Sequence, residues 1–147
     1  MEFDVGISCL LTRVQQVVSQ KYKVILSDYA LTPVQYITLK CLWEFGSLSP
    51  GQLAEATFTD RSSMTGVLDK LENQGYVKRV PDPYDRRSIK ICLTESGEEL
   101  KHNVMDVVAN VQADIRNGIR QRDPSVTDAE ISIFYKLLNI VSDLPPS

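Results

Sequence analysis

The chain has 147 residues, of which 43% are hydrophobic and 24% charged, and its formal net charge is −3. This composition is typical of a folded domain and excludes a disordered or low-complexity chain. No apolar run approaches the roughly 20 residues that span a bilayer, and the acidic start lacks the basic residues of a secretory signal. We therefore expect a cytoplasmic protein with no membrane partner.

The charge is unevenly distributed along the sequence. Residues 1–59 carry four basic and five acidic side chains, residues 60–93 carry seven and five, and residues 94–147 carry five and nine. The middle segment is therefore the basic part of an acidic protein. A local positive field can attract a polyanion such as DNA even when the whole molecule is acidic.

The N-terminal part of the sequence predicts three helices. Apolar residues recur every three or four positions from residue 7 to 29, which is the period of one long amphipathic helix. The segments that start at Thr32 and Ser49 each have an N-cap residue, a following proline and a glutamine at the capping-box position. We expect a second helix that ends at Gly46 and a short third helix that ends near Ala56.

Residues 60–93 predict a further helix and a hairpin. The helix starts at Asp60 and stops at Gly75, and a turn of about four residues separates it from the preceding helix, as in a helix-turn-helix. The segments YVKRV and SIKICL are typical of strands. A helix-turn-helix followed by a hairpin makes a winged helix.

The remaining residues predict two more helices. Thr94 begins a long helix that ends before an Asp-Pro pair, and a capping box of Thr127 and Glu130 begins a last helix. This last helix is expected to stop at Pro145 and Pro146. Together with the first helix, these two predict a second lobe that is all helical.

The sequence offers no set of residues for catalysis or metal binding. His102 is the one histidine, and no GxSxG motif, paired-carboxylate motif or glycine-rich phosphate loop occurs. Cys9, Cys41 and Cys92 are odd in number and lack CxxC spacing, which argues against a disulfide framework and a zinc site. We expect no enzyme activity, no metal and no cofactor.

Short polar side chains crowd the start of the helix that follows Asp60, namely Arg61, Ser62, Ser63 and Thr65. Recognition helices present this end to base edges in the major groove. The arginine could bind guanine or a phosphate, and the serines could donate to either. The alternative is an ordinary solvated helix start.

The predicted hairpin turn lies in VPDPYDRRSIKICL and carries two adjacent arginines at its tip. Prolines and aspartates favour turns, and exposed arginines keep a hairpin soluble, so an ordinary turn is one interpretation. A narrow minor groove attracts arginine, however, and a hairpin beside a recognition helix could insert one. The arginine pair therefore indicates that the wing contacts DNA.

With these elements in this order, the sequence from Leu31 to about Leu100 resembles the MarR family of bacterial and archaeal transcriptional regulators. The resemblance lies in LTPVQYITLKCLWE, in LSPGQLAEATFTDRSSMTGVLDKLENQGYVKR and above all in the wing segment DPYDRRSIKICLTESGEEL. It implies a homodimer that binds a palindromic operator on double-stranded DNA. Residues 31–93 would be the winged helix-turn-helix DNA-binding lobe, and the helices of residues 1–30 and 94–147 would form the dimerisation lobe.

The resemblance also implies roles for single residues. Arg87 matches the wing arginine that enters the minor groove, and Asp85 matches the aspartate that orients this arginine. Arg86 and Lys90 are then candidates for phosphate contacts, and residues 61–65 match the base-reading end of the recognition helix.

Many members of the family release DNA when a phenolic or other small aromatic ligand binds between the two lobes. Six residues of this sequence fall near the expected junction, namely Arg13, Tyr22, Tyr29, Tyr36, Trp43 and His102. We therefore expect a sequence-specific repressor that a small aromatic effector releases. The rival from another class is a winged-helix protein-interaction module that does not bind DNA.

Other members respond to oxidation of a cysteine, which makes Cys9 an alternative sensor. Alignment with the hydroperoxide sensors of the family places Ser8, not Cys9, at the reactive position. Tyr22 corresponds to one of the two tyrosines that hydrogen-bond the sensor cysteine, but Pro33 replaces the other. These two departures argue against hydroperoxide sensing.

Overall fold

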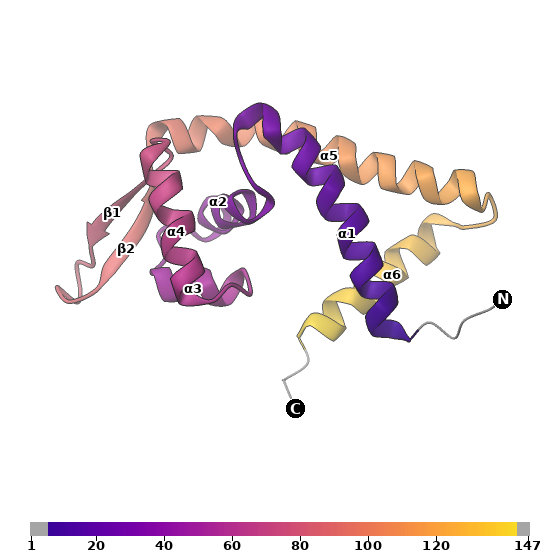
Figure 1. Cartoon of the computed structure of the whole chain (residues 1–147), viewed down its shortest axis with the longest axis horizontal. Coiled ribbons are helices and arrows are strands. Elements are labelled where there is room, and N and C mark those ends of the chain that lie inside the picture. Colours follow the sequence, from indigo (N-terminus) through magenta and orange to yellow (C-terminus); the bar gives the residue numbers. More distant parts are fainter. Residues whose placement is uncertain (1–5, 144–147) are drawn as a thin grey trace. The chain divides into compact units, whose positions relative to one another are not determined.

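A computed structural model describes residues 6–143 of the chain, which are mostly helical with one two-stranded sheet (Figure 1). The elements are α1 (Ile7–Leu26), a 3-10 turn (Ser27–Tyr29), α2 (Pro33–Phe45), α3 (Pro50–Ala56), α4 (Arg61–Asn73), β1 (Val77–Pro81), β2 (Ile89–Leu93), α5 (Glu95–Arg122) and α6 (Asp128–Ser142). The predicted mainly α (α+β) winged-helix fold is confirmed. Contacts between residues divide the chain into two compact units, 1–108 and 109–147, with the boundary inside α5.

Three of the predicted helix starts have a complete capping box. Thr32, Ser49 and Thr127 each accept a hydrogen bond from the backbone N–H three residues later, and the side chain at that position accepts one in return. Gly46 and Gly75 follow the ends of α2 and α4 with φ angles of 76° and 79°. Because glycine adopts this left-handed backbone without a steric penalty, both stops predicted from the sequence are confirmed.

The first helix ends earlier than its apolar period predicts. α1 stops at Leu26, and the chain continues as a 3-10 turn that closes at Ala30 with a φ angle of 52°. The N–H of Leu31 donates to the carbonyl of Leu26 at 3.1 Å, which tightens the connection to α2. The end of α1 at Leu26 could not be predicted from the apolar spacing, because one 3-10 turn hardly changes which side chains lie on the same face.

The core of the first unit joins the helix-turn-helix to the hairpin. Its fully buried apolar side chains come from α1, α2, α3, α4, β2 and α5: Leu26, Leu39, Leu42, Leu53, Met64, Leu68, Leu71, Ile91 and Val104. β1 pairs antiparallel with β2, so that Val77 lies opposite Leu93. Backbone hydrogen bonds of 2.7 and 3.2 Å between Leu48 and Ile91 also tie the hairpin to the segment that connects α2 to α3.

The start of α5 packs closely against the winged helix. The hydroxyl of Thr94 caps the helix by accepting from the N–H of Gly97 at 3.1 Å, as predicted. A Cβ atom on Gly97 would collide with the carbonyl of Tyr76, so a glycine is needed here. The indole N–H of Trp43 donates to the carbonyl of Gly97 at 2.9 Å, which adds a contact from α2.

Residues 109–143 bury little of their apolar surface. The buried hydrophobic side chains among them are Val111 and Ile131. The predicted capping box at the start of α6 is present, whereas the predicted stop at Pro145 and Pro146 lies outside the described residues. Within residues 6–143, no helix is both long and apolar enough to cross a membrane.

Candidate nucleic-acid interface

Asp60 organises the start of α4. Its carboxylate accepts hydrogen bonds from the backbone N–H of Ser63 at 2.8 Å and from the hydroxyls of Ser62 and Ser63 at 2.7 Å each. These bonds, chiefly the one from the Ser62 hydroxyl, hold the pKa of Asp60 well below its usual range. Both serine hydrogens are therefore engaged, and each hydroxyl keeps lone pairs with which to accept.

The predicted contact residues all lie on the exposed side of α4. Arg61, Ser62, Ser63 and Thr65 are exposed, while Met64, Leu68 and Leu71 are buried in the core. The Arg61 guanidinium lies near the start of α3, where a Cβ atom on Gly51 would be 3.7 Å from its Nη2 atom. The sequence therefore places a short polar surface at the N-terminal end of α4. Recognition helices present this end to the bases of DNA.

The wing tip is a turn that backbone hydrogen bonds hold together. The N–H of Asp82 donates to the carbonyl of Ser88 at 2.9 Å, and the N–H of Ser88 donates to the carbonyl of Asp85 at 2.9 Å. The two adjacent arginines, Arg86 and Arg87, are exposed in this turn. The hairpin thus holds two cationic side chains in solvent on an ordered backbone.

Asp85 acts on the backbone of the turn. Its carboxylate accepts from the N–H of Arg87 at 3.0 Å and from the hydroxyl of Ser88 at 3.0 Å. The predicted role of Asp85 was to orient the side chain of Arg87. The contacts present in the structure hold the peptide unit of Arg87, which fixes where its side chain leaves the turn.

Lys90 lies farther from the tip than the arginines and is half-buried. Its Nζ atom lies 3.4 Å from Oε1 of Gln52 on α3 and 3.9 Å from Oδ2 of Asp82. Lys90 therefore links the wing to α3, and the proposed phosphate contact would have to compete with these two partners.

An ion-pair cluster that was not predicted from the sequence connects the wing to α4. Arg79 on β1 pairs with Asp69 at 2.7 Å and with Glu72, both on α4. The hydrogen bond that the Arg79 guanidinium donates to the Asp69 carboxylate is the main cause of a raised pKa for Arg79. The spacing of Asp69 and Glu72, three residues apart on one helix face, was the available signal. This cluster braces the hairpin against the recognition helix.

Three of the candidate ligand residues form a row of aromatic rings. The centroids of Tyr22 and Tyr36 are 6.0 Å apart, and those of Tyr36 and Trp43 are 6.4 Å apart. Tyr36 is only 4% exposed, and its burial raises the pKa of its phenol to about 12. The structure therefore brings α1 and α2 together through aromatic side chains, with Tyr36 inside the core.

The other three candidate ligand residues are placed differently. The hydroxyl of Tyr29 donates to the carbonyl of Asn103 on α5 at 3.4 Å. Arg13 on α1 and His102 on α5 are both exposed. The structure thus joins Tyr22, Tyr36 and Trp43 directly and leaves the two basic candidates in solvent.

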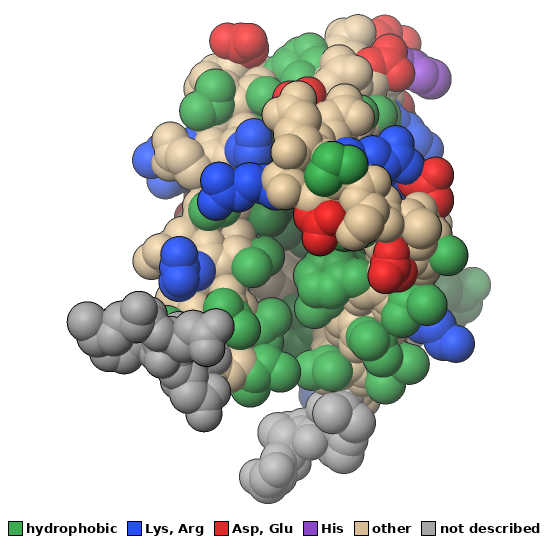
Figure 2. Space-filling model, turned by 90° about the vertical axis from the view of Figure 1, so that its right-hand side faces the viewer, with side chains coloured by type: hydrophobic (Ala, Val, Ile, Leu, Met, Phe, Trp, Pro, Cys, Tyr) green, Lys and Arg blue, Asp and Glu red, His purple; other side chains and the backbone are tan. Residues whose placement is uncertain are grey.

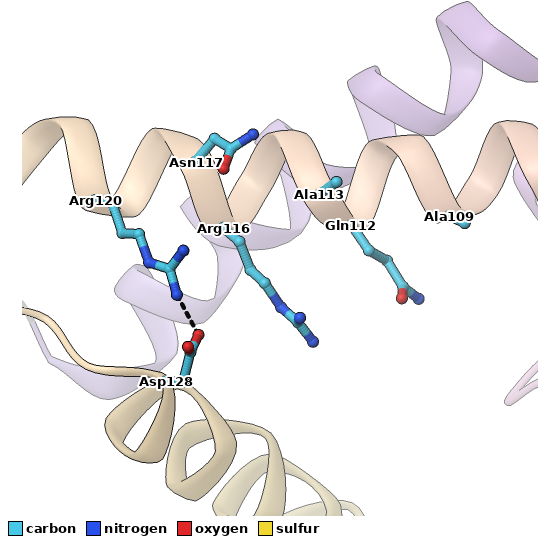
Figure 3. Close-up of a pocket in the computed structure, with 7 residues that line it drawn as sticks. All are labelled: Ala109, Gln112, Ala113, Arg116, Asn117, Arg120 and Asp128. Carbon is cyan, nitrogen blue, oxygen red and sulfur yellow. Dashed lines mark hydrogen bonds and ion pairs between the residues drawn. The ribbon is translucent and has the colours of Figure 1, made fainter.

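A separate polar hollow of about 390 Å³ lies within residues 109–128. Figure 3 shows Gln112, Arg116 and Arg120 projecting to the same side of α5, with Arg120 paired to Asp128 at the start of α6. Ala109, Ala113 and Asn117 complete the lining. None of these residues was predicted as a site, because polar residues on an exposed helix face carry no distinctive pattern.

The cysteines are free thiols in different surroundings. Cys9 is exposed on α1, whereas Cys41 and Cys92 are half-buried. Burial, reinforced by the nearby Glu44 carboxylate, raises the pKa of Cys41 and so disfavours its reactive thiolate. Among residues 6–143, no three His, Cys, Asp or Glu side chains gather as a metal site would require.

A helix-turn-helix followed by an arginine-tipped hairpin defines a winged-helix DNA-binding protein. The profile of the MarR family matches residues 31–89. The chain is 33% identical over 138 residues to the transcriptional regulator YsmB of Bacillus subtilis, covering 94% of this chain and 90% of that protein. It is 30% identical over 111 residues to the organic hydroperoxide resistance transcriptional regulator of Bacillus subtilis, covering 76% of each. The chain belongs to the MarR family of DNA-binding transcriptional regulators.

Solved structures agree with this fold. BpsR of Bordetella bronchiseptica, whose DNA binding is regulated by 6-hydroxynicotinic acid, matches with a TM-score of 0.82, 23% identity and 99% coverage of both chains. A cysteine-to-serine mutant of MarR from E. coli, in complex with operator DNA, matches with a TM-score of 0.78 and 24% identity, covering 95% of this chain and 94% of that one. At these identities the match shows a shared fold.

Proposed function

We propose that the protein is a homodimeric repressor that binds a palindromic operator, with α4 in the major groove and the wing in the minor groove. The observation that carries this proposal is the wing tip, where an ordered turn holds Arg86 and Arg87 in solvent. An ordered turn that carries two exposed cations is suited to a polyanion, because its backbone has little conformational entropy left to lose on binding.

Each DNA-binding candidate has a distinct proposed role. Arg87 enters the minor groove from a turn that Asp85 holds, while Arg86 and Lys90 contact phosphates. Arg61, Ser62, Ser63 and Thr65 read bases or phosphates from the start of α4. The exposure of Arg61 to Ser63 and of both wing arginines supports this assignment.

The proposed dimer rests on apolar side chains that the single chain leaves in solvent. Figure 2 shows hydrophobic side chains gathered along α1 and, separately, along α6. The exposed apolar residues of these helices include Ile7, Val14, Val17, Ile133, Leu137 and Ile140, each more than 40% exposed. We propose that the helices of residues 1–30 and 94–147 form the dimerisation lobe, since a second copy would cover these surfaces.

We propose that operator binding represses transcription rather than activating it. We further propose that a small aromatic effector releases the DNA. The ring row of Tyr22, Tyr36 and Trp43 supports this idea because aromatic walls suit an aromatic ligand. Oxidation of the exposed thiol of Cys9 is the alternative trigger.

Selection from random DNA duplexes tests the proposed binding. We expect the selected sites to be palindromes with half-sites about one helical turn apart, occupied by two chains each, with affinity that falls steeply as salt rises. Absence of binding even at low salt would instead support the protein-interaction module.

A thermal-shift screen tests the proposed trigger. Phenolic acids, antibiotics and oxidants are added to the protein, because a ligand that binds the folded state raises its melting temperature. A compound that raises this temperature should also release the selected operator. A compound that stabilises the protein but leaves the DNA bound would contradict its role as an effector.

A further inference from the structure

Tyr84 is the most exposed large hydrophobic side chain among the described residues, at 98% exposure. It lies at the wing tip, two residues before Arg86 and three before Arg87. The wing role proposed above involves only the charged residues of this turn, so Tyr84 has no assigned function.

The backbone around Tyr84 is held in place. Its own N–H donates to Oδ1 of Asp82 at 2.9 Å, and Pro83 restricts the preceding φ angle. The side chain therefore projects from an ordered turn, and little backbone entropy would be lost when it binds a partner.

The two aspartates of the turn form hydrogen bonds and an ion pair within the hairpin. The carboxylate of Asp82 accepts from the N–H of Tyr84 and lies 3.9 Å from Lys90, while that of Asp85 accepts from the N–H of Arg87 and the hydroxyl of Ser88. Both acidic groups are thus engaged in bonds within the hairpin. The phenol of Tyr84 and the guanidinium groups of Arg86 and Arg87 are exposed in the same turn, as is the carboxylate of Asp85 with its two hydrogen bonds.

We propose that the hydroxyl of Tyr84 donates a hydrogen bond to a phosphodiester oxygen beside the groove that the wing enters. A phenol is a donor that suits a phosphate oxygen, and tyrosine is one of the residues that make such contacts in protein–DNA complexes. Tyr84 thereby adds a neutral anchor next to the two charged ones. The inference rests on the proposed docking of the wing.

Two substitutions at the same residue test the contact on the selected operator. Tyr84→Phe removes the hydroxyl and keeps the ring, whereas Tyr84→Ala removes both. We expect the two variants to lose the same affinity, about tenfold each, because the lost bond is to a charged oxygen. The salt dependence of binding should be unchanged, since a neutral side chain releases no counterion, whereas Arg86→Ala should reduce the slope by about one.

A second measurement locates the oxygen. Single methylphosphonate substitutions along the operator should reveal one phosphate per half-site whose neutralisation weakens the wild type more than it weakens Tyr84→Phe. Tyr76→Phe is the matched control, because it removes a phenol hydroxyl of the same winged helix from a half-buried tyrosine that no proposed DNA contact involves, and it should bind the operator like the wild type. Circular dichroism melting should show both Tyr84 variants folded, since the side chain of Tyr84 is 98% exposed.

Wild-type affinity of Tyr84→Phe would overturn the proposal, whether or not Tyr84→Ala loses affinity. A uniform response to every methylphosphonate would overturn it as well. The operator affinity of Arg87→Ala distinguishes failure of the Tyr84 contact from failure of the proposed wing docking. If Arg87→Ala weakens binding and Tyr84→Phe does not, the wing still docks and only the tyrosine contact is wrong.

Discussion

Residues 31–93 and residues 109–143 differ in how they bury their apolar side chains. The first segment places Leu39, Leu42, Leu68 and Ile91 at 1% exposure or less. In the second, Ile133, Leu137 and Ile140 are each at least 50% exposed. The winged helix is therefore packed within a core that Leu26 of α1 and Val104 of α5 complete, whereas the C-terminal segment leaves apolar surface in solvent.

This difference separates the tasks of the two segments. Binding DNA requires contact groups held at fixed positions, and the ion pairs of Arg79 and the bond from Trp43 to Gly97 supply that rigidity. An exposed apolar helix surface is suited to association with a second copy.

Leu39→Ala should lower the free energy of unfolding by about 2 to 5 kcal/mol, because Leu39 is fully buried in the winged-helix core. Urea denaturation measures the loss, which should be the same at every protein concentration. A loss below about 1 kcal/mol would mean that the core can collapse around the cavity, and the segment would then be less tightly packed than its burial indicates.

Gly97→Ala should destabilise the protein by about 1 to 3 kcal/mol, because the added methyl group collides with the carbonyl of Tyr76 and α5 must shift. Thermal unfolding of this variant beside Gly118→Ala provides the comparison. A Cβ atom on Gly118 meets nothing within 4 Å, so that variant should be no less stable than the wild type. Equal effects of the two changes would contradict the close approach at Gly97.

Leu137→Ala should weaken the proposed dimer about tenfold, since removal of an apolar contact at an interface costs more than 1 kcal/mol at important positions. The stability of the isolated chain should change little, because Leu137 is 54% exposed there. Sedimentation equilibrium measures the dimer, with the exposed neighbour Lys136→Ala as the control. An unchanged dissociation constant would remove this part of α6 from the interface.

Asp60→Asn should flatten the dependence of stability on pH in acid. The folded pKa of Asp60 lies below its ordinary value of 3.8, so its contribution is complete above pH 4 and is lost as pH falls through the folded pKa. Asparagine also caps helices but does not titrate in this range. Urea unfolding at pH 5 and below should show that the free energy of unfolding declines less steeply with falling pH in Asp60→Asn than in the wild type. Identical declines would show that the folded state does not lower the pKa of Asp60.

The helix starts were predictable from the sequence because each depends on residues within four positions. The boxes at Thr32, Ser49 and Thr127 are such local patterns. The pairing of Arg79 with α4 and the bond from Trp43 to Gly97 were not, since each joins segments that approach only after folding. Asp85 shows how far the site could be predicted from the sequence. Its place in the wing was predicted, but its hydrogen bond with the backbone N–H of Arg87 is known only from the folded turn.

We propose that the wing binds DNA through two arginines with different roles. Arg87→Ala and Arg86→Ala, titrated on the selected operator and on random DNA over a range of salt concentrations, test this most directly. We predict that Arg87→Ala loses about 1 to 3 kcal/mol and discriminates less between the two DNAs, whereas Arg86→Ala weakens both equally and lowers the salt slope by about one. Unchanged operator affinity of Arg87→Ala at matched salt would contradict the account.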